Sequence, residues 1–207
     1  MTDPQGEREE GFSLVKALYE QALREHRERL EELLDPQVIY VTDLVYCPLK
    51  RGFRQRFPEL AFSFKPPQVT GTLIHRGLRE TLEEAGFELE KPVEASIRIG
   101  DNLYRVKGRV DAYREDLIIE IKTGRAGQQL PHEHHVLQVK LYLDLTGVGR
   151  GMIVYITPDR LVEYTVKPER GLLEKMLQEH LEEARAPLWD WECRLCTFAD
   201  YCSRRTA

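Results

Sequence analysis

Residues 108–124, GRVDAYREDLIIEIKTG, decide the fold class, because polar and apolar side chains alternate on both sides of a short turn. Side chains of a strand point alternately to opposite faces, so the stretch predicts a β-hairpin that turns at residues 114–116. Its apolar face is predicted to carry Val110, Ala112, Leu117, Ile119 and Ile121. The other face is predicted to gather two acids and an amine, namely Asp111, Glu120 and Lys122.

Two interpretations fit this charged face. Many antiparallel sheets have one face on the core and one in water, and the three charges are then ordinary solvated residues. Alternatively, they form a metal-dependent active site. Two carboxylates supply the hard oxygen ligands that Mg²⁺ or Mn²⁺ prefers, and a nearby lysine orients or activates water. The hairpin by itself favours the solvated face, so the rest of the chain has to decide.

Composition narrows the class of protein. The chain has 207 residues, 42% of them hydrophobic, which suits one domain with an appendage or two small lobes. The net charge of −5 argues against a general basic field for nucleic acid. No apolar run reaches the roughly 18 residues of a membrane span, and the N-terminus lacks a secretory pattern. We therefore expect a cytoplasmic protein without membrane contact, whose four cysteines are reduced and available as ligands.

The order of the predicted elements indicates an α/β protein. Helices are predicted over residues 8–34, 42–57, 70–85, 132–146 and 168–185; three strands fall within 92–122, and two more at 151–157 and 161–166. Thr42 is the predicted cap of the second helix, Pro66 and Pro67 mark a break, and Gly86 ends the third helix. This order predicts a mixed sheet flanked by helices, with helical additions at both ends.

Three cysteines near the C-terminus, Cys193, Cys196 and Cys202, have the spacing C-x2-C-x5-C. Short loops of this kind bring thiolates together around a metal. The fourth ligand would be Cys47, because the chain has no other cysteine, and the two ends would then be clasped together. Zinc and an iron–sulfur cluster both accept four thiolates, and the spacing does not separate them. The alternative is a buried, apolar Cys47 and an incomplete site.

Taken in chain order, the chemically active residues resemble a known family. The ordered set is Cys47, His75 within Gly71-x3-His75, Asp111, Glu120-Ile121-Lys122, Gln138-x3-Tyr142, Cys193, Cys196 and Cys202. Over roughly residues 40–205 it resembles the CRISPR-associated four-cysteine exonucleases, which are RecB-like nucleases of the PD-(D/E)XK superfamily. One position departs from the pattern, since Val110 stands where the superfamily has a nominal proline. The resemblance implies a restriction-endonuclease-like core.

The resemblance also implies a role for each matching residue around the hairpin. The imidazole of His75, the carboxylates of Asp111 and Glu120 and the carbonyl oxygen of Ile121 would bind a catalytic Mn²⁺ or Mg²⁺. Lys122 would be the catalytic lysine. Near a metal and partly desolvated, its pKa would fall and it would take a proton from water; otherwise it stays charged and holds the phosphate.

The remaining matches concern the flanking elements. Gln138 and Tyr142 match the motif that positions the DNA backbone and the lysine, and four-residue spacing gives them one helix face. The four cysteines would hold an iron–sulfur cluster, [4Fe–4S] or [2Fe–2S]. The implied regions are a helical N-terminal region, 1–65, that contributes Cys47, a RecB-like nuclease core, 66–170, and a C-terminal helix and cysteine tail, 171–207, packed with the N-terminal region.

The implied activity is metal-dependent digestion of single-stranded DNA from an end, 5′→3′, during prespacer processing in CRISPR spacer acquisition. The implied partners are single-stranded DNA and the CRISPR integrase proteins. Some members of the family form rings, so the resemblance allows an oligomer and does not require one. Two other functions compete. A non-catalytic DNA-end-binding module of an adaptation complex would bind DNA regardless of divalent metal. A RecB-like nuclease of general recombinational repair would have the same chemistry in another pathway.

Two segments keep an open role. Residues 50–65 are basic and contain four phenylalanines, a combination that binds single strands by phosphate attraction and base stacking. Equally, these phenylalanines are core residues and the arginines a solvated face. The cluster His132-Glu133-His134-His135 is a rival metal site, but its place after Pro131 favours a solvated segment that at most touches DNA.

Overall fold

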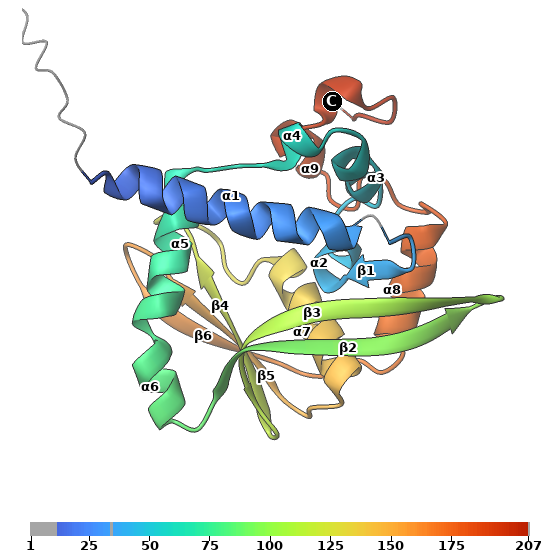
Figure 1. Ribbon diagram of the computed structural model, residues 1–207. Helices are drawn as coiled ribbons and strands as arrows, with labels where there is room; N and C mark the ends of the chain where they lie inside the picture. The colour runs from blue at the N-terminus through green and yellow to red at the C-terminus, as the bar shows by residue number, and fades with distance from the viewer. Residues whose placement is uncertain (1–11, 34, 207) are drawn as a thin grey trace, which may run out of the picture.

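The computed structural model describes residues 12–33 and 35–206 (Figure 1). Within these residues six strands form one mixed sheet in the order β1-β3-β4-β5-β6, with β2 paired to β3 off this path. The strands are β1 (Val38–Tyr40), β2 (Glu88–Ile99), β3 (Asn102–Arg114), β4 (Leu117–Thr123), β5 (Gly151–Ile156) and β6 (Leu161–Val166). The predicted α/β class, a mixed sheet flanked by helices, is confirmed.

The pairing of β3 organises the sheet. β2 runs antiparallel to β3 from a turn at Gly100 and Asp101, where Gly100 takes a left-handed φ of 57°. The other edge of β3 holds β4 in antiparallel and β1 in parallel pairing. The predicted hairpin over 108–124 is therefore present as the end of β3, a turn and β4. Helix α7 (Glu133–Thr146) then crosses from β4 to the parallel strand β5.

Helices on both faces of the sheet divide the core into two parts. Ile118 packs on one face with α7 and α8 (Leu172–Leu181), whereas Ile119 packs on the other with α5 (Pro66–Gly77) and α6 (Arg79–Glu84). Leu117 and Ile121 share the face of Ile119, as the alternation along β4 predicted. The apolar ladder of the hairpin is thus covered by α5 and α6, and the face of Glu120 is turned toward α7.

The predicted shared face of Val110 and Ala112 is wrong, because they lie in different parts of the core. The reason is an interruption of the pleat between them. Leu89 and Lys91 of β2 pair with Ala112 and Val110, so Glu90 lies opposite Asp111. Glu90 has a left-handed φ of 50°, a backbone conformation that residues other than glycine rarely adopt. The regular alternation is lost at this pair, and the Asp111 side chain is turned toward the neighbouring strand.

The N-terminal helices differ from their predicted bounds. The helix predicted over 8–34 is α1 (Leu14–Leu33); residues 8–11 and 34 lie outside the described residues. The helix predicted over 42–57 is two separate helices, α2 (Val41–Leu44) and α3 (Leu49–Arg56), and a third, α4 (Pro58–Ala61), follows directly after that range. Thr42 is inside α2 and is not its cap. The N-cap of α2 is Tyr40, and the backbone N–H of Tyr40 donates to the Asp43 carboxylate.

The third predicted helix is interrupted and begins earlier than expected. It consists of α5 and α6, and Pro66 and Pro67 start α5 instead of breaking the chain. Proline suits the first helical turn, because its missing N–H has no helical partner there. Gly86 follows α6 with a left-handed φ of 80°, so the predicted helix end is confirmed.

The segment of α3 and α4 meets the C-terminal tail, and these two segments together form the terminal assembly. Figure 1 shows α3 and α4 beside the C-terminal helix α9 (Glu192–Leu195). The stacked rings of Phe53 in α3 and Phe198, just before η1 (Ala199–Tyr201), lie 5.5 Å apart and join the two segments. The region predicted as helical over 1–65 also contributes β1 to the central sheet. Among the described residues, no helix is long and apolar enough to cross a bilayer.

Candidate active site and cysteine cluster

Asp111 lies where β3 and β4 separate. The ladder between these strands ends at Ala112 and Ile119. Beyond it, the Asp111 carboxylate accepts a hydrogen bond from the backbone N–H of Ile121 at 2.7 Å. The carboxylate thus replaces a ladder partner and is fixed beside the carbonyl of the same residue.

Helix α5 brings His75 to this point. Its Nε2 lies 3.2 Å from the carbonyl oxygen of Ile121, and its Nδ1 lies 3.6 Å from Oδ1 of Asp111. Three of the positions predicted as metal ligands therefore meet, although they come from an α-helix and two strands. Ile74, the neighbour of His75, packs with Ile119 and Ile121, so burial of the apolar face of α5 orients the imidazole.

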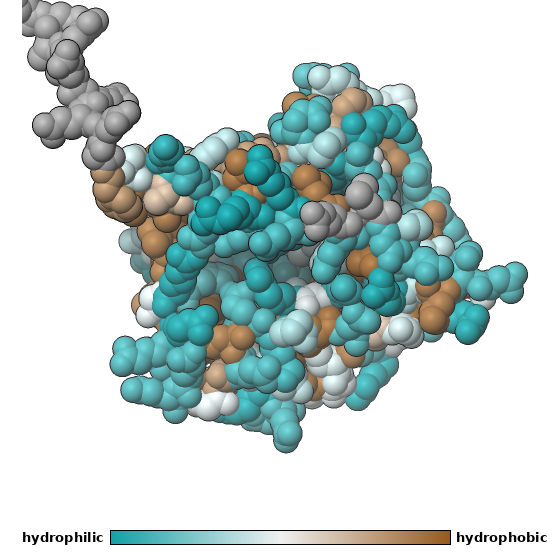
Figure 2. Space-filling view, viewed as in Figure 1, coloured by the Kyte–Doolittle hydropathy of each residue, from teal (hydrophilic) through white to brown (hydrophobic). Residues whose placement is uncertain are grey.

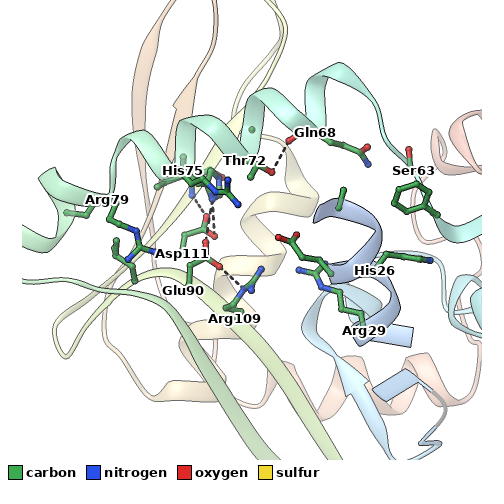
Figure 3. Close-up of a pocket in the computed structure, with 18 of the residues that line it drawn as sticks. His26, Arg29, Ser63, Gln68, Thr72, His75, Arg79, Glu90, Arg109 and Asp111 are labelled. Atoms are coloured by element: carbon green, nitrogen blue, oxygen red, sulfur yellow. Dashed lines mark hydrogen bonds and ion pairs between the residues drawn. The ribbon is translucent and has the colours of Figure 1, made fainter. Parts of the chain in front are cut away.

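Glu90 of β2 also belongs to this cluster, and sequence reasoning missed it. Ligand atoms of His75, Glu90 and Asp111 all lie within 4.8 Å of one another. Arg109 holds the other oxygen of Glu90 at 2.6 Å. The signal was present in the turn at residues 100 and 101, because counting back along both strands puts residue 90 opposite residue 111. Figure 3 shows His75, Glu90 and Asp111 directed toward one another, with Arg109 beside Glu90.

Glu120 and Lys122 lie on the α7 side of the sheet. The Nζ of Lys122 is 2.7 Å from Oε1 of Glu120 and 2.8 Å from Oε1 of Gln138. Glu120 is 3% exposed, and its Oε2 is buried without a hydrogen-bond partner. A buried carboxylate oxygen without a hydrogen-bond partner lowers the stability of the folded protein, and this oxygen is left free to accept a ligand.

The environment shifts the pKa of each acidic and basic group in the cluster. Burial raises the pKa of Glu120 to about 7 and also raises that of Asp111. Burial lowers the pKa of Lys122, as expected for a desolvated amine, but the adjacent Glu120 carboxylate outweighs it and the net shift is upward. The hydrogen bond with Glu90 raises the pKa of His75.

Tyr142 is buried against β3. Its hydroxyl donates to the carbonyl oxygen of Arg109 at 3.0 Å. Gly108 makes this packing possible, because a Cβ there would lie 2.5 Å from Cε1 of the Tyr142 ring. Of the predicted pair on α7, Gln138 contacts the lysine directly, whereas Tyr142 anchors α7 to the strand that carries Asp111.

A cavity of about 600 Å³ lies in front of His75, Glu90 and Asp111. Figure 2 shows it as a hollow with a hydrophilic rim on the face that α1 crosses. Its basic lining comes from α1, α5, α6 and β3, as Arg29, Arg76, Arg79 and Arg109. The acids Glu25, Glu90 and Asp111 line the same hollow, so it holds charges of both signs.

Comparison with known proteins identifies the family. No family model matches the sequence. A curated protein, the CRISPR-associated exonuclease Cas4 of Saccharolobus solfataricus, is 34% identical over 200 residues, which are 91% of this chain and 97% of that protein. The chain belongs to the Cas4 exonuclease family. The chain is also similar to the crystal structure of SSO0001, with a TM-score of 0.85 and 32% identity over 95% of this chain and 99% of that one.

Membership of the Cas4 family confirms the family that the sequence predicted, and the chain is a nuclease. A more distant structure, the alkaline exonuclease LHK-Exo of Laribacter hongkongensis, has a TM-score of 0.49 and 13% identity over 74% of this chain and 90% of its own.

The four cysteines of this Cas4-family chain line one small cavity, although Cys47 is far from the others in sequence. Burial raises the pKa of the Cys47 thiol to about 11. Among the described residues, no three cysteine Sγ atoms lie within 4.8 Å of one another. The thiols therefore surround a common space without closing on a point.

Glu192 connects the segment that carries Cys47 to the C-terminal tail beside this cavity, and sequence reasoning missed it as well. It is 1% exposed; Oε1 accepts the N–H of Cys47 at 2.9 Å and the ammonium of Lys50 at 2.8 Å. Oε2 accepts the N–H groups of Leu188 and Trp189 at 2.9 and 3.1 Å. Protein contacts alone thus join the loop of Cys47 to α9, the helix that carries Cys193.

The basic segment 50–65 is mainly structural. Arg51 donates to backbone carbonyls of Leu33, Asp35 and Val38, and Arg54 pairs with Asp43. Phe53 and Phe57 stack within the terminal assembly. Phe62 packs against Tyr19 and His26 of α1 and also lines the cavity in front of His75 and Asp111.

The cluster 132–135 is not the solvated segment expected. His135 Nδ1 lies 2.8 Å from the Tyr155 hydroxyl, and His134 packs 5.0 Å from the ring of Trp191. Burial lowers the pKa of His134 to about 4 and that of His135 to about 2. These rings form part of an aromatic wall.

Proposed function

We propose that this nuclease digests single-stranded DNA from an end in the 5′→3′ direction, using a divalent metal, and that it processes prespacers for CRISPR integrase proteins. The observation that carries the proposal is Glu120, a buried carboxylate with one unpartnered oxygen. It lies beside a lysine, and its pKa is also shifted by the nearby Asp111 and His75. Such a group is unfavourable in a folded protein unless it serves as a ligand.

The donor set fits Mn²⁺ or Mg²⁺. His75, Asp111, Glu120 and the carbonyl oxygen of Ile121 would hold the ion, with mostly hard oxygen ligands. Glu90, whose carboxylate lies with His75 and Asp111, would assist them. When bound, the ion would polarise the phosphate and make water a better nucleophile. Lys122, fixed by Glu120 and Gln138, would hold the phosphate as a cation. The arginines of the cavity would attract the strand and align its backbone.

An iron–sulfur cluster is the proposed occupant of the cysteine cavity, held by Cys47, Cys193, Cys196 and Cys202. A tetrahedral zinc site with Zn–S bonds of about 2.3 Å would bring its sulfurs within about 3.8 Å of one another. The wider spacing of these thiols suits a group in which several irons separate the sulfurs. Its role in this proposal is structural, since it would fix the Cys47 loop against the tail.

The proposal is tested by digestion of single-stranded DNA labelled at either end, with Mn²⁺ or Mg²⁺, by wild type and Glu120→Ala. We expect only the wild type to cut, and a 5′ label to be released in small products before a 3′ label. If both proteins bind DNA and neither cuts, the non-catalytic end-binding module is favoured instead. Digestion that proceeds equally in the variant would overturn the assignment of Glu120.

A general repair nuclease would pass the same test, so the pathway needs another observation. CRISPR integrase genes beside the gene, and co-purification of their products with this chain, support the role in spacer acquisition. Neighbouring helicase genes without any integrase would favour repair.

A further inference from the structure

We propose that a second groove, beside Lys122, binds unpaired DNA bases by stacking them on an aromatic strip formed by Trp189, Trp191, His132 and His134. This inference rests on the proposed action on single strands and names where the bases lie. The groove has a volume of about 1020 Å³, and all four rings line it.

The four rings of the strip are in contact with one another, and the ring of Trp189 is anchored to the backbone. The rings of His132 and His134 stack at 5.4 Å, and His134 lies 5.0 Å from Trp191 and 6.2 Å from Trp189. The indole N–H of Trp189 donates to the carbonyl oxygen of Val45 at 2.8 Å, which fixes its ring. Rings that are held in place before binding lose little entropy when a base stacks on them.

The groove adjoins the catalytic cluster. Thr123, Gly124 and Arg125, which follow Lys122 directly, line it, as does Thr70 of α5. The next residue of α5, Gly71, lines the other hollow, the catalytic cavity in front of His75 and Asp111. A Cβ on Gly71 would lie 3.5 Å from Oγ1 of Thr123, so α5 crosses the end of β4 at this point. The two hollows therefore lie on either side of this crossing, and a phosphate at Lys122 places its neighbouring nucleotides toward the groove.

The chemistry of the groove favours bases over phosphates. Its side chains with a formal charge are Arg125 and Glu133, one of each sign. Burial lowers the pKa of His134 to about 4, so at neutral pH its ring stacks as a neutral aromatic. The catalytic cavity, in contrast, is lined with several arginines. Stacking on aromatic rings with little charge is how proteins hold unpaired bases without sequence preference, and paired bases do not offer their faces.

The chain provides its own reporter, because Trp189 and Trp191 are its two tryptophans. We would titrate the full-length protein with unlabelled oligo-dT in EDTA, which prevents cleavage, and follow tryptophan emission. A parallel titration with dye-labelled oligo-dT would measure total binding by anisotropy. We expect emission to be quenched with the same dissociation constant as the anisotropy gives, and a blunt duplex of equal length to quench far less.

A substitution at the exposed residue Leu195 tests the groove without changing the packing of the core. It lies on the rim of the groove and is 78% exposed, so Leu195→Glu adds a negative charge without disturbing the core. Leu161→Glu is the matched control, at a residue 73% exposed and outside the groove. We expect Leu195→Glu to weaken oligo-dT binding about tenfold, and Leu161→Glu to bind like the wild type. His134→Ala, checked for an unchanged melting temperature, should weaken it by a similar factor.

The outcomes separate this inference from the proposed function. Binding by anisotropy without quenching, no binding of oligo-dT, or equal quenching by the duplex would each overturn the groove. If such a protein still digests single strands with Mn²⁺, the proposed function stands and only the groove is wrong. If quenching and the Leu195→Glu effect appear but no DNA is cut, the groove stands and the nuclease assignment fails.

Discussion

Gln138 of α7 accepts a hydrogen bond from Lys122 of β4, with 2.8 Å between Oε1 and Nζ. Both side chains are largely buried, so a residue on the crossover helix determines where the ammonium lies. We predict that Gln138→Ala lowers kcat about 10- to 100-fold, the usual cost of removing a group that orients an active residue. KM for DNA should change little, and steady-state kinetics would measure both. A fall in binding with unchanged kcat would contradict this.

Glu90 should contribute to metal binding. Thermal melts with increasing Mn²⁺ would report binding without any cleavage, because a ligand that binds only the folded state raises its stability. We expect a clear rise in melting temperature for the wild type, none for Asp111→Asn, and for Glu90→Gln a response that needs about tenfold more Mn²⁺. Glu94→Gln, also on β2, is the control and should respond like the wild type. An unaltered response of Glu90→Gln would remove Glu90 from the site.

Glu192 should hold the terminal assembly together. Its replacement by alanine leaves Lys50 and three backbone N–H groups without their acceptor in a buried place. We expect Glu192→Ala to lower the free energy of unfolding by about 3 kcal/mol and to reduce iron content. The exposed neighbour Asp190, changed to alanine, should do neither.

Cys202→Ala tests the cluster directly. We expect loss of the brown colour and a lower melting temperature, since the tail would no longer be fixed to the Cys47 loop. Iron analysis of the purified variant is the measurement. Full iron content would show that Cys202 is not a ligand.

Gly108→Ala should disturb the active site through packing. The new methyl would lie 2.5 Å from the Tyr142 ring, so α7 or β3 must shift, at a cost of about 1–3 kcal/mol in unfolding free energy. Gly52→Ala is the matched control, because nothing lies within 4 Å of its new methyl and alanine favours α3 by up to about 1 kcal/mol. Chemical denaturation of both variants would measure the contrast. Equal stability would mean that Tyr142 moves aside freely.

Acidification should destabilise the protein through His135. Burial, and then the positive charge of Lys122 and the rings of His134 and His132, lower its pKa from 6.5 to about 2. A depressed pKa contributes stability that is complete above 6.5 and is lost as the pH falls, because the unfolded chain takes up the proton first. Between pH 7 and pH 5 this amounts to about 2 kcal/mol. Denaturation of wild type and His135→Gln at both pH values would measure it, and the variant should show the smaller loss.

Much of the active site could be predicted from the sequence because its spacing is local. Glu120 and Lys122 are two residues apart on one strand, so they share a face whatever the strand packs against. Gln138 and Tyr142 are four apart on one helix and share a face for the same reason. The order of these motifs with the cysteines sufficed for the family.

The tertiary structure decided what depends on contacts between distant segments. Glu90 joins Asp111 through strand pairing, and its left-handed backbone separates Val110 from Ala112, which no local pattern encodes. Glu192 reaches Cys47, 145 positions away, only because the C-terminal tail packs against the segment that carries Cys47. The aromatic groove likewise combines the start of α7 with the C-terminal tail. The sequence by itself determined which residues share a face wherever the helix or strand is regular. Packing of those faces determined which elements meet, because burial of apolar surface acts between segments regardless of their distance along the chain.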